Sequence, residues 1–178
     1  MNSPIPEFKQ VAQFHGHVCP GLAIGYRVSI AALDWLGEQR AADEQIVAVA
    51  ENRSCAVDAL QCVLGTTLGK GNLIILDWGK QGYTVFRRPD GAGMRFFFQL
   101  PPHLASLPRE ELIPAILGAP QDEIIRVAPA QQAIPDRARV EPSVPCAICG
   151  EPTMQSALIR IDGALVCHGC APSGDAAV

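Results

Sequence analysis

The stretch FHGHVCPG at residues 14–21 concentrates side chains that bind metal ions or attack electrophiles. His17 and Cys19 are two positions apart, so an extended loop points both to the same side. Cys19 lies just before a predicted helix start, where the positive end of the helix dipole lowers the pKa of a thiol, and Cys55 opens another helix. If the two helix N-termini face each other, His17, Cys19 and Cys55 converge on one point.

Two interpretations of this group stay open. Three such ligands with a water molecule would suit zinc or a similar divalent ion, with one position open for chemistry. Alternatively, the cysteines are small apolar core residues and the histidines are hydrogen-bonded loop residues, because buried free cysteines are common. One of these two alternatives therefore places a divalent metal in the core. It would be a second metal, besides the zinc ion expected at the C-terminal cysteines.

A glycine-rich stretch, GTTLGKGN at residues 65–72, carries a further cation. It is not a Walker A loop, because this chain has Leu64 and Gly71 where that motif needs a glycine and a Ser or Thr. Its lysine and backbone N–H groups would receive a carboxylate or phosphate beside the thiols. In the alternative interpretation, its glycines only supply the positive φ of a tight turn. The candidate cofactor-binding residues here are Gly69, Lys70 and Asn72.

Four of the seven cysteines form two CxxC pairs near the C-terminus, Cys146–Cys149 and Cys167–Cys170. This spacing is typical of a structural zinc ion with four thiolate ligands and no open position. A hairpin turning at Asp162-Gly163 would return the second pair to the first. So short a segment buries little, so the metal must supply its folding energy. The alternative is four free or disulfide-linked cysteines.

Composition limits the class of protein. Hydrophobic residues make up 48% of the 178 residues and charged ones 18%, which predicts a globular chain. A net charge of −4 argues against nucleic-acid binding, which needs a basic patch. There is no signal-peptide pattern and no apolar run long enough to span a bilayer, so we expect no membrane association. We expect a cytoplasmic protein, whose reduced cysteines indicate metal binding or chemistry.

The elements that position these residues follow from apolar periodicity. Spacings of three and four predict helices at residues 5–14, 22–37 and 55–65. Short apolar or alternating runs predict strands at residues 45–52, 72–79, 83–89 and 94–100. We expect a further helix over 107–118, broken at Pro114, and a short helix over 121–129.

This order of elements predicts an α+β fold, with helices packed on a largely antiparallel sheet and a small C-terminal four-cysteine zinc-finger module. Four prolines and few large apolar residues mark a stiff linker before the module. The predicted divisions are a core at 1–128, a Pro-rich linker at 129–145 and a zinc finger at 146–171.

The segments FHGHVCPGLAIGYR and CAVDALQCVLGTTLGKGNLIILDWGK resemble the FmdE family of formylmethanofuran dehydrogenase subunits. The CxxC pairs resemble the treble-clef zinc finger that many members carry. The resemblance covers residues 1–128 and 146–171 and implies a core that tends to form a homodimer. In one departure, Thr66 stands where the family usually has a cysteine, so a role that needs that thiol is in doubt. The family's characteristic positions map to His17, Cys19, Cys55, Asp58, Gln61, Gly69, Lys70 and Asn72.

The resemblance implies a metal-binding accessory protein or subunit associated with molybdenum or tungsten formylmethanofuran dehydrogenase-type one-carbon oxidoreductases. The core pocket would hold the metal, and the zinc finger would dock the oxidoreductase or a cofactor-assembly partner. A third hypothesis, a regulator whose finger contacts DNA or RNA polymerase, is disfavoured by the acidity and by the single arginine in the finger.

The alternative is a stand-alone thiolate- or metal-dependent enzyme that uses His17, Cys19 and Cys55. Lys70 would stabilise negative charge, and Asp58 or His15 would move protons. The catalytic candidates are then Cys19, Cys55 and Lys70. The metal-ligand candidates are His17, Cys19 and Cys55 in the core and Cys146, Cys149, Cys167 and Cys170 in the finger. The sequence names neither the substrate nor the core metal.

Overall fold

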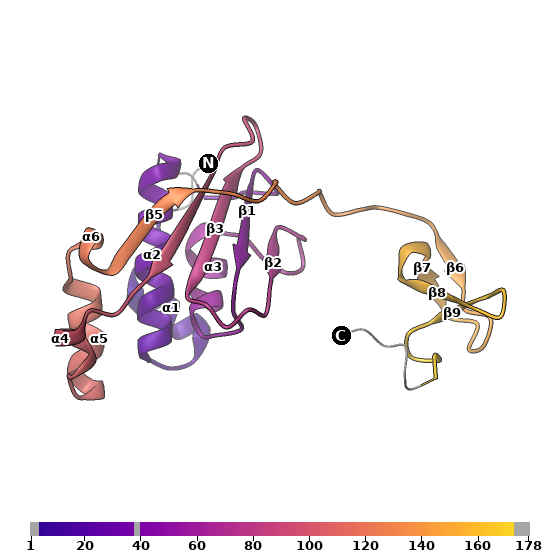
Figure 1. Cartoon of the computed structure of the whole chain (residues 1–178). Coiled ribbons are helices and arrows are strands. Elements are labelled where there is room, and N and C mark those ends of the chain that lie inside the picture. Colours follow the sequence, from indigo (N-terminus) through magenta and orange to yellow (C-terminus); the bar gives the residue numbers. More distant parts are fainter. Residues whose placement is uncertain (1–3, 38–39, 173–178) are drawn as a thin grey trace. The chain divides into compact units, whose positions relative to one another are not determined.

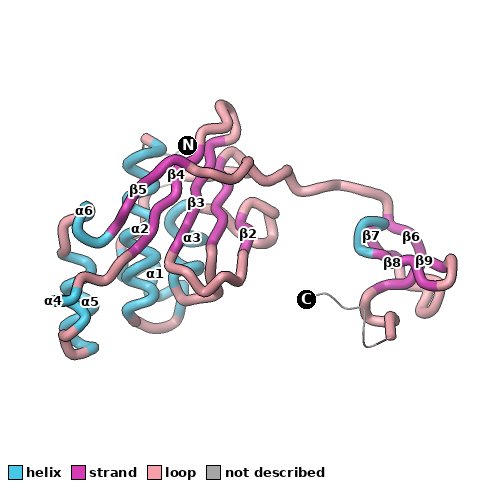
Figure 2. Tube along the Cα trace, in the orientation of Figure 1, coloured by secondary structure: helices cyan, strands magenta, loops and turns pink. Residues whose placement is uncertain are grey.

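The chain forms two compact units, residues 1–138 and 139–178. The computed structural model describes residues 4–37 and 40–172. In the first unit five strands form one sheet in the order β2-β1-β3-β4-β5, with helices against it (Figures 1 and 2). These strands are β1 (Ile46–Ala50), β2 (Leu73–Ile75), β3 (Gly82–Arg87), β4 (Gly93–Phe98) and β5 (Ile125–Pro129).

The predicted α+β class with a largely antiparallel sheet is confirmed. Three of the four strand pairings in this sheet are antiparallel, and only β1 and β2 are parallel. That pair is parallel because the helix between them carries the chain back to the start of the sheet. The helices of the unit are α1 (Phe8–His15), α2 (Pro20–Leu36), α3 (Ala56–Leu64), α4 (Pro102–Ala105), α5 (Arg109–Gly118) and α6 (Gln121–Ile124).

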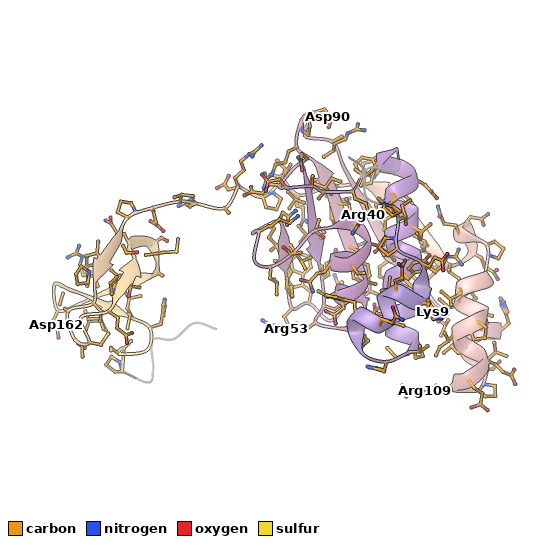
Figure 3. The ribbon with its side chains drawn as sticks, turned by 180° about the vertical axis from the view of Figure 1, so that it is seen from behind. Lys9, Arg40, Arg53, Asp90, Arg109 and Asp162 are labelled. Carbon is orange, nitrogen blue, oxygen red and sulfur yellow. The ribbon has the colours of Figure 1, made fainter. Side chains whose placement is uncertain are left out.

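Helices α1, α2 and α3 cover one face of the sheet, and Figure 3 shows this layer from behind. All five residues of β1 are buried, because both faces of the strand are covered. Ile46, Ala48 and Ala50 pack into the main core under the helices. Val47 and Val49 form a smaller cluster with Phe86 on the opposite face. A strand buried on both sides reads as a continuous apolar run, as IVAVA does.

The helix boundaries follow local signals. Pro20 is the first residue of α2, where its missing N–H costs no hydrogen bond. Gly37 and Gly65 end α2 and α3 with φ values of 72° and 74°, in the left-handed region that glycine adopts without strain.

Helices α2 and α3 approach so closely that only glycine fits at their contact. A Cβ atom added to Gly25 would lie 2.3 Å from the carbonyl oxygen of Ala56 and 2.5 Å from its Cα atom. One turn earlier, a Cβ atom on Gly21 would lie 3.2 Å from the Cβ atom of Cys55. The two small residues therefore bring the N-terminus of α3 directly against the first turns of α2.

Two predicted helices differ from the structure. Pro114 lies inside a continuous α5, so the predicted break is wrong. Pro114 removes only one hydrogen bond, to a carbonyl in the exposed first turn, and the fully buried Ile116 keeps the helix packed. Of residues 121–129 only the first four are helical. The rest form β5, because Ile125 and its neighbours pair with the otherwise open edge of β4.

Residues 130–136, which the sequence predicts to be part of the linker, lie against the sheet; we call them the strap. Ala130 N–H donates to the carbonyl of Gly93 at 2.9 Å, and Ile134 packs on the smaller apolar cluster. The guanidinium of Arg88 donates to the carbonyls of Pro135 and Asp136 at 2.8 and 3.0 Å. The first unit therefore extends beyond β5, to Ala138.

The second unit consists of two short hairpins. Its elements are β6 (Ser143–Pro145), β7 (Pro152–Met154), the 3-10 turn η1 (Gln155–Ala157), β8 (Leu158–Ile161) and β9 (Ala164–Cys167). The hairpin of β8 and β9 turns at Asp162-Gly163, both with positive φ, as the sequence predicts. Among its described residues only Cys146 and Val166 are buried apolar side chains.

We predict that Gly25→Ala destabilises the first unit by about 1–3 kcal/mol, because the added methyl group overlaps the backbone of α3. Urea unfolding followed by circular dichroism measures this change. The matched control is Gly118→Ala at the end of α5, where an added Cβ meets nothing within 4 Å. Equal stability of both variants would show that the helices separate without cost.

Candidate metal centres

Four potential metal ligands converge at the N-termini of α2 and α3. One donor atom from each of His15, His17, Cys19 and Cys55 lies within 4.8 Å of every other. Cys19 is buried and His15 and Cys55 are partly buried, whereas His17 is exposed. We call these four residues the His/Cys cluster. Two imidazoles and two thiols are a donor set that zinc accepts in tetrahedral geometry.

Local structure places each member of the cluster. Gly16 ends α1 with φ 95° and turns the chain, so that the rings of His15 and His17 come within 4.3 Å between centroids. Cys19 is the N-cap of α2, and its sulfur accepts the N–H of Leu22 at 3.4 Å. Cys55 reaches the same point because α3 begins there against α2.

His15 is oriented as a metal-binding histidine is. Its Nδ1 atom lies 2.7 Å from Oδ2 of Asp58, whose other oxygen accepts from Gln61 at 3.2 Å. Its Nε2 atom is buried and has no hydrogen-bond partner among the described residues. Buried polar atoms are nearly always paired, so this nitrogen needs a partner that the protein does not supply. A carboxylate on one ring nitrogen and a metal on the other is the usual arrangement for a ligand histidine.

The electrostatics of Cys55 correct the expectation of an activated thiol. Burial is the main cause that raises the pKa of Cys55, and the neighbouring Cys19 thiol raises it further. These effects outweigh the start of the helix. Without a metal ion, Cys55 is therefore a protonated thiol near neutral pH.

The glycine-rich turn does not lie beside the thiols, contrary to expectation. It follows the C-terminus of α3, a nine-residue helix of about 13 Å, whereas Cys55 precedes the N-terminus. Lys70 Nζ donates to the carbonyl of Gly65 at 2.6 Å, which holds it at that far end. Asn72 is fully buried and donates to the carbonyls of Asp43 and Ile46 at 3.1 and 2.9 Å.

These contacts make the turn structural. Asn72 Oδ1 also accepts the N–H of Thr67, which closes the turn. Gly69 belongs to the same turn, away from the cluster. Thr66, at the position of the family's usual cysteine, is buried under the end of α3, where its hydroxyl donates to Leu60. Lys70 and Thr66 therefore both lie at the end of α3 that is far from the cluster.

The second unit holds the other group of potential ligands. The sulfur atoms of Cys146, Cys149, Cys167 and Cys170 all lie within 4.8 Å of one another. The sulfur of Cys146 accepts the N–H groups of Cys167 and Ile148 at 3.3 and 3.5 Å. Backbone N–H groups such as these lower the pKa of Cys146 to about 6, so it is ready to bind a metal as thiolate. Hydrogen bonds with the Cys167 and Cys149 thiols raise the pKa of Cys170 to about 12.

Sequence reasoning missed His15 as a donor, because it assigned the fourth position to water. The available signal was the first histidine of the HGH motif, two residues before the candidate ligand His17. Asp58, three residues after Cys55, was the signal for the carboxylate that contacts His15. The described residues contain no helix with the length and apolarity needed to cross a bilayer.

Comparisons with known proteins agree with this architecture. A family model described as "FmdE, Molybdenum formylmethanofuran dehydrogenase operon" matches residues 14–125. A protein of Archaeoglobus fulgidus named "Probable S-adenosyl-L-methionine-binding protein" is 42% identical over 89 residues, which are 48% of this chain and 24% of that protein. The chain thus matches about a quarter of that relative's length.

A solved structure shares the fold. The crystal structure of a protein from Syntrophus aciditrophicus that is like the FmdE subunit of tungsten formylmethanofuran dehydrogenase has a TM-score of 0.70 and 23% identity to this chain. The match covers 91% of this chain and 88% of that one.

We predict that Asp58→Asn weakens zinc binding at the His/Cys cluster about 10- to 100-fold, because an amide orients His15 less well than a carboxylate. Competition with a chromogenic chelator measures the affinity of the full chain. Asp77→Asn is the matched control, because Asp77 is exposed and pairs with Arg53. Unchanged affinity in Asp58→Asn would contradict a ligand role for His15.

A strong chelator should unfold the second unit and leave the first one folded. Only two buried apolar side chains support the described part of the second unit, so the metal–thiolate bonds must hold it. Two-dimensional amide NMR of the full chain should show the signals of residues 143–167 collapsing to random-coil positions. Persistence of those signals after complete metal removal would contradict a metal-dependent fold.

Proposed function

Because the chain belongs to the FmdE family, we propose that it is a metal-binding accessory protein or subunit of a molybdenum or tungsten formylmethanofuran dehydrogenase-type one-carbon oxidoreductase. The observation that carries the proposal is the convergence of His15, His17, Cys19 and Cys55 on one point of the family-matched region. The name of the Syntrophus protein supports the same partner.

The donor set supports holding a metal rather than catalysis. Four side chains fill the positions of a tetrahedral zinc ion, so none is left for substrate. The raised pKa of Cys55 argues against a nucleophilic thiolate at neutral pH. Two features favoured the alternative of a stand-alone enzyme, Lys70 and a low-pKa thiol. Lys70 lies at the far end of α3. The pKa of the Cys55 thiol is raised rather than lowered.

The surroundings of the cluster suit a protein that docks onto a partner. Phe14 and Val18, which flank the two histidines, expose 59% and 53% of their surface. Two large apolar side chains exposed on either side of a polar site suit an interaction surface. His17 is exposed between them, so the metal would lie next to the partner.

The zinc in the second unit has a structural role, and that unit offers a further contact surface. Separate binding and sedimentation experiments distinguish a second copy of this chain from the oxidoreductase as that partner.

The decisive experiment counts metal ions per chain. We expect two zinc ions in the full chain, and one in each of the double variants Cys19→Ser/Cys55→Ser and Cys146→Ser/Cys149→Ser, measured by elemental analysis after dialysis. Cys62→Ser is the matched control, because this thiol belongs to neither cluster. One ion in the wild type, lost only in the second variant, would rule out a metal in the core.

The partner is tested with immobilised protein and purified formylmethanofuran dehydrogenase subunits. We expect wild type to retain one of these subunits and Phe14→Ser/Val18→Ser to lose it with its metal content unchanged. Sedimentation of the protein alone reports whether the same surface forms a homodimer. Failure of the wild type to retain any of the subunits would reject the accessory role, even if the metal count is two.

A further inference from the structure

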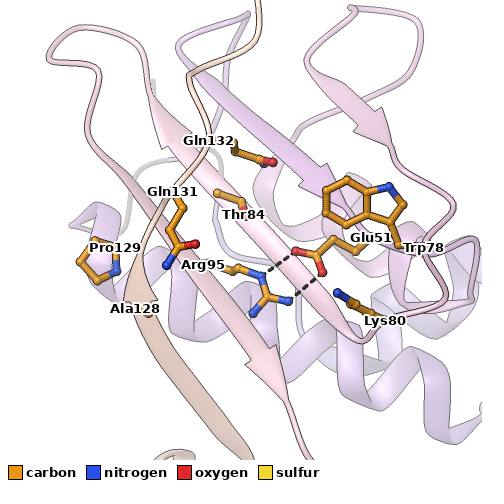
Figure 4. Close-up of a pocket in the computed structure, with 9 residues that line it drawn as sticks. All are labelled: Glu51, Trp78, Lys80, Thr84, Arg95, Ala128, Pro129, Gln131 and Gln132. Carbon is orange, nitrogen blue, oxygen red and sulfur yellow. Dashed lines mark hydrogen bonds and ion pairs between the residues drawn. The ribbon is translucent and has the colours of Figure 1, made fainter.

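A cavity of about 470 Å³ lies on the face of the sheet that the helices do not cover (Figure 4). Thr84 of β3 pairs with Arg95 of β4, and both side chains point to this face. Glu51 follows β1, and the turn after β2 contributes Trp78 and Lys80. None of these five residues belongs to the His/Cys cluster or to the four-cysteine group of the second unit.

The strap forms the opposite wall of the cavity. Gln131 and Gln132 line it, between the anchor of Ala130 on Gly93 and the apolar contact of Ile134. Arg88 holds the far end of the strap through two backbone carbonyls. Both amide side chains are therefore presented from a fixed segment.

The floor of the cavity is a fixed guanidinium. Arg95 Nε and Nη2 donate to the two carboxylate oxygens of Glu51 at 2.6 and 2.7 Å. A Cβ atom on Gly82 would lie 2.5 Å from both Arg95 Nη2 and Glu51 Oε2, so the pair needs a glycine beneath it. The Glu51 side chain is 4% exposed and that of Arg95 33%. The bidentate pairing leaves Nη1 of Arg95 without a hydrogen bond to the described residues.

The same glutamate positions an aromatic surface and a second cation. Its carbonyl accepts the N–H groups of Trp78 and Lys80, each at 3.1 Å. Trp78 is 56% exposed, and Lys80 Nζ lies 5.8 Å from the centre of its ring. Lys80 forms no ion pair with any residue that the structure describes. Two cations and one carboxylate give the cavity a positive excess in a chain whose net charge is −4.

We propose that this cavity binds a small organic anion built on a nitrogen heterocycle. Its carboxylate or phosphate group lies between Arg95 Nη1 and Lys80 Nζ, because a fixed guanidinium with a free ammonium beside it is a receptor for such groups. Its ring lies on the indole of Trp78. Thr84, Gln131 and Gln132 offer hydroxyl and amide groups to the polar edge of the ring. The volume matches the range of small-molecule sites.

The test uses the fluorescence of Trp78 in the full chain. The chain has two tryptophans, so Trp35→Phe leaves Trp78 as the only emitter. The probes are orotate with uracil and adenosine monophosphate with adenosine, each pair differing by the anionic group. We expect saturable quenching by a charged member and at least tenfold weaker binding of its uncharged partner. Comparing the two pairs tells a carboxylate from a phosphate ligand.

Lys80→Gln should weaken binding of the charged probe by about tenfold or more, as the loss of one charge-assisted hydrogen bond predicts. Lys9→Gln is the matched control, because Lys9 is an exposed lysine on α1 (Figure 3). As a second measurement, side-chain amide NMR signals of Gln131 and Gln132 should shift with the same affinity.

Three results would overturn the proposal. One is the absence of saturable quenching by either charged probe at about 5 mM. The second is equal binding of the charged and uncharged members of both pairs. The third is equal affinity in the Lys80→Gln and Lys9→Gln variants. Because neither cysteine cluster takes part, each result leaves the metal count of the proposed function unaffected.

Discussion

The close crossing of α2 and α3 is the constraint on which the candidate metal centre depends. Gly25 lets the backbone of Ala56 approach to a distance that any side chain would prevent, and Gly21 lies against Cys55. This contact fixes two helix N-termini side by side, although they are more than thirty residues apart in the sequence. Cys19 and Cys55 meet because the helices meet. The two histidines complete the cluster because α1 ends at the same point.

The segment from β1 to α3 joins this cluster to the opposite face of the sheet. Glu51 holds Arg95 with its side chain and fixes the turn of Trp78 and Lys80 with its carbonyl. Asn52 then donates to the carbonyl of Lys80 at 2.6 Å and accepts from Ser54 at 2.6 Å. The Ser54 hydroxyl in turn accepts the first N–H of α3, directly after Cys55. Four residues within the segment 51–55 therefore shape both the cavity and the cluster.

The two units are stabilised by different forces. The first unit buries a continuous apolar core between the helices and the sheet, with a smaller cluster beneath the strap. This core does not include a metal site as its main support, and the His/Cys cluster lies at its edge, at the N-termini of α2 and α3. In the second unit the described residues fully bury only two apolar side chains, Cys146 and Val166, and four thiols meet at one point. A metal at these four thiols would supply the folding energy that so short a segment lacks.

What the sequence by itself determined was local. Gly37 and Gly65 set the ends of two helices, the CxxC spacing indicated the four-thiol cluster, and Asp162-Gly163 set the hairpin between its halves. It also indicated that Cys19 and Cys55 open helices, and a resemblance identified the family.

Only the tertiary structure decided where distant segments meet. Residues 125–129 became a strand because β4 had an open edge, and Pro114 stayed helical because Ile116 is held in the core. Lys70 was predicted to lie beside the thiols, but the length of α3 separates them. His15 became a candidate donor because Asp58 reaches its ring from another helix. Such contacts depend on packing between segments far apart in the chain, which periodicity and spacing do not encode.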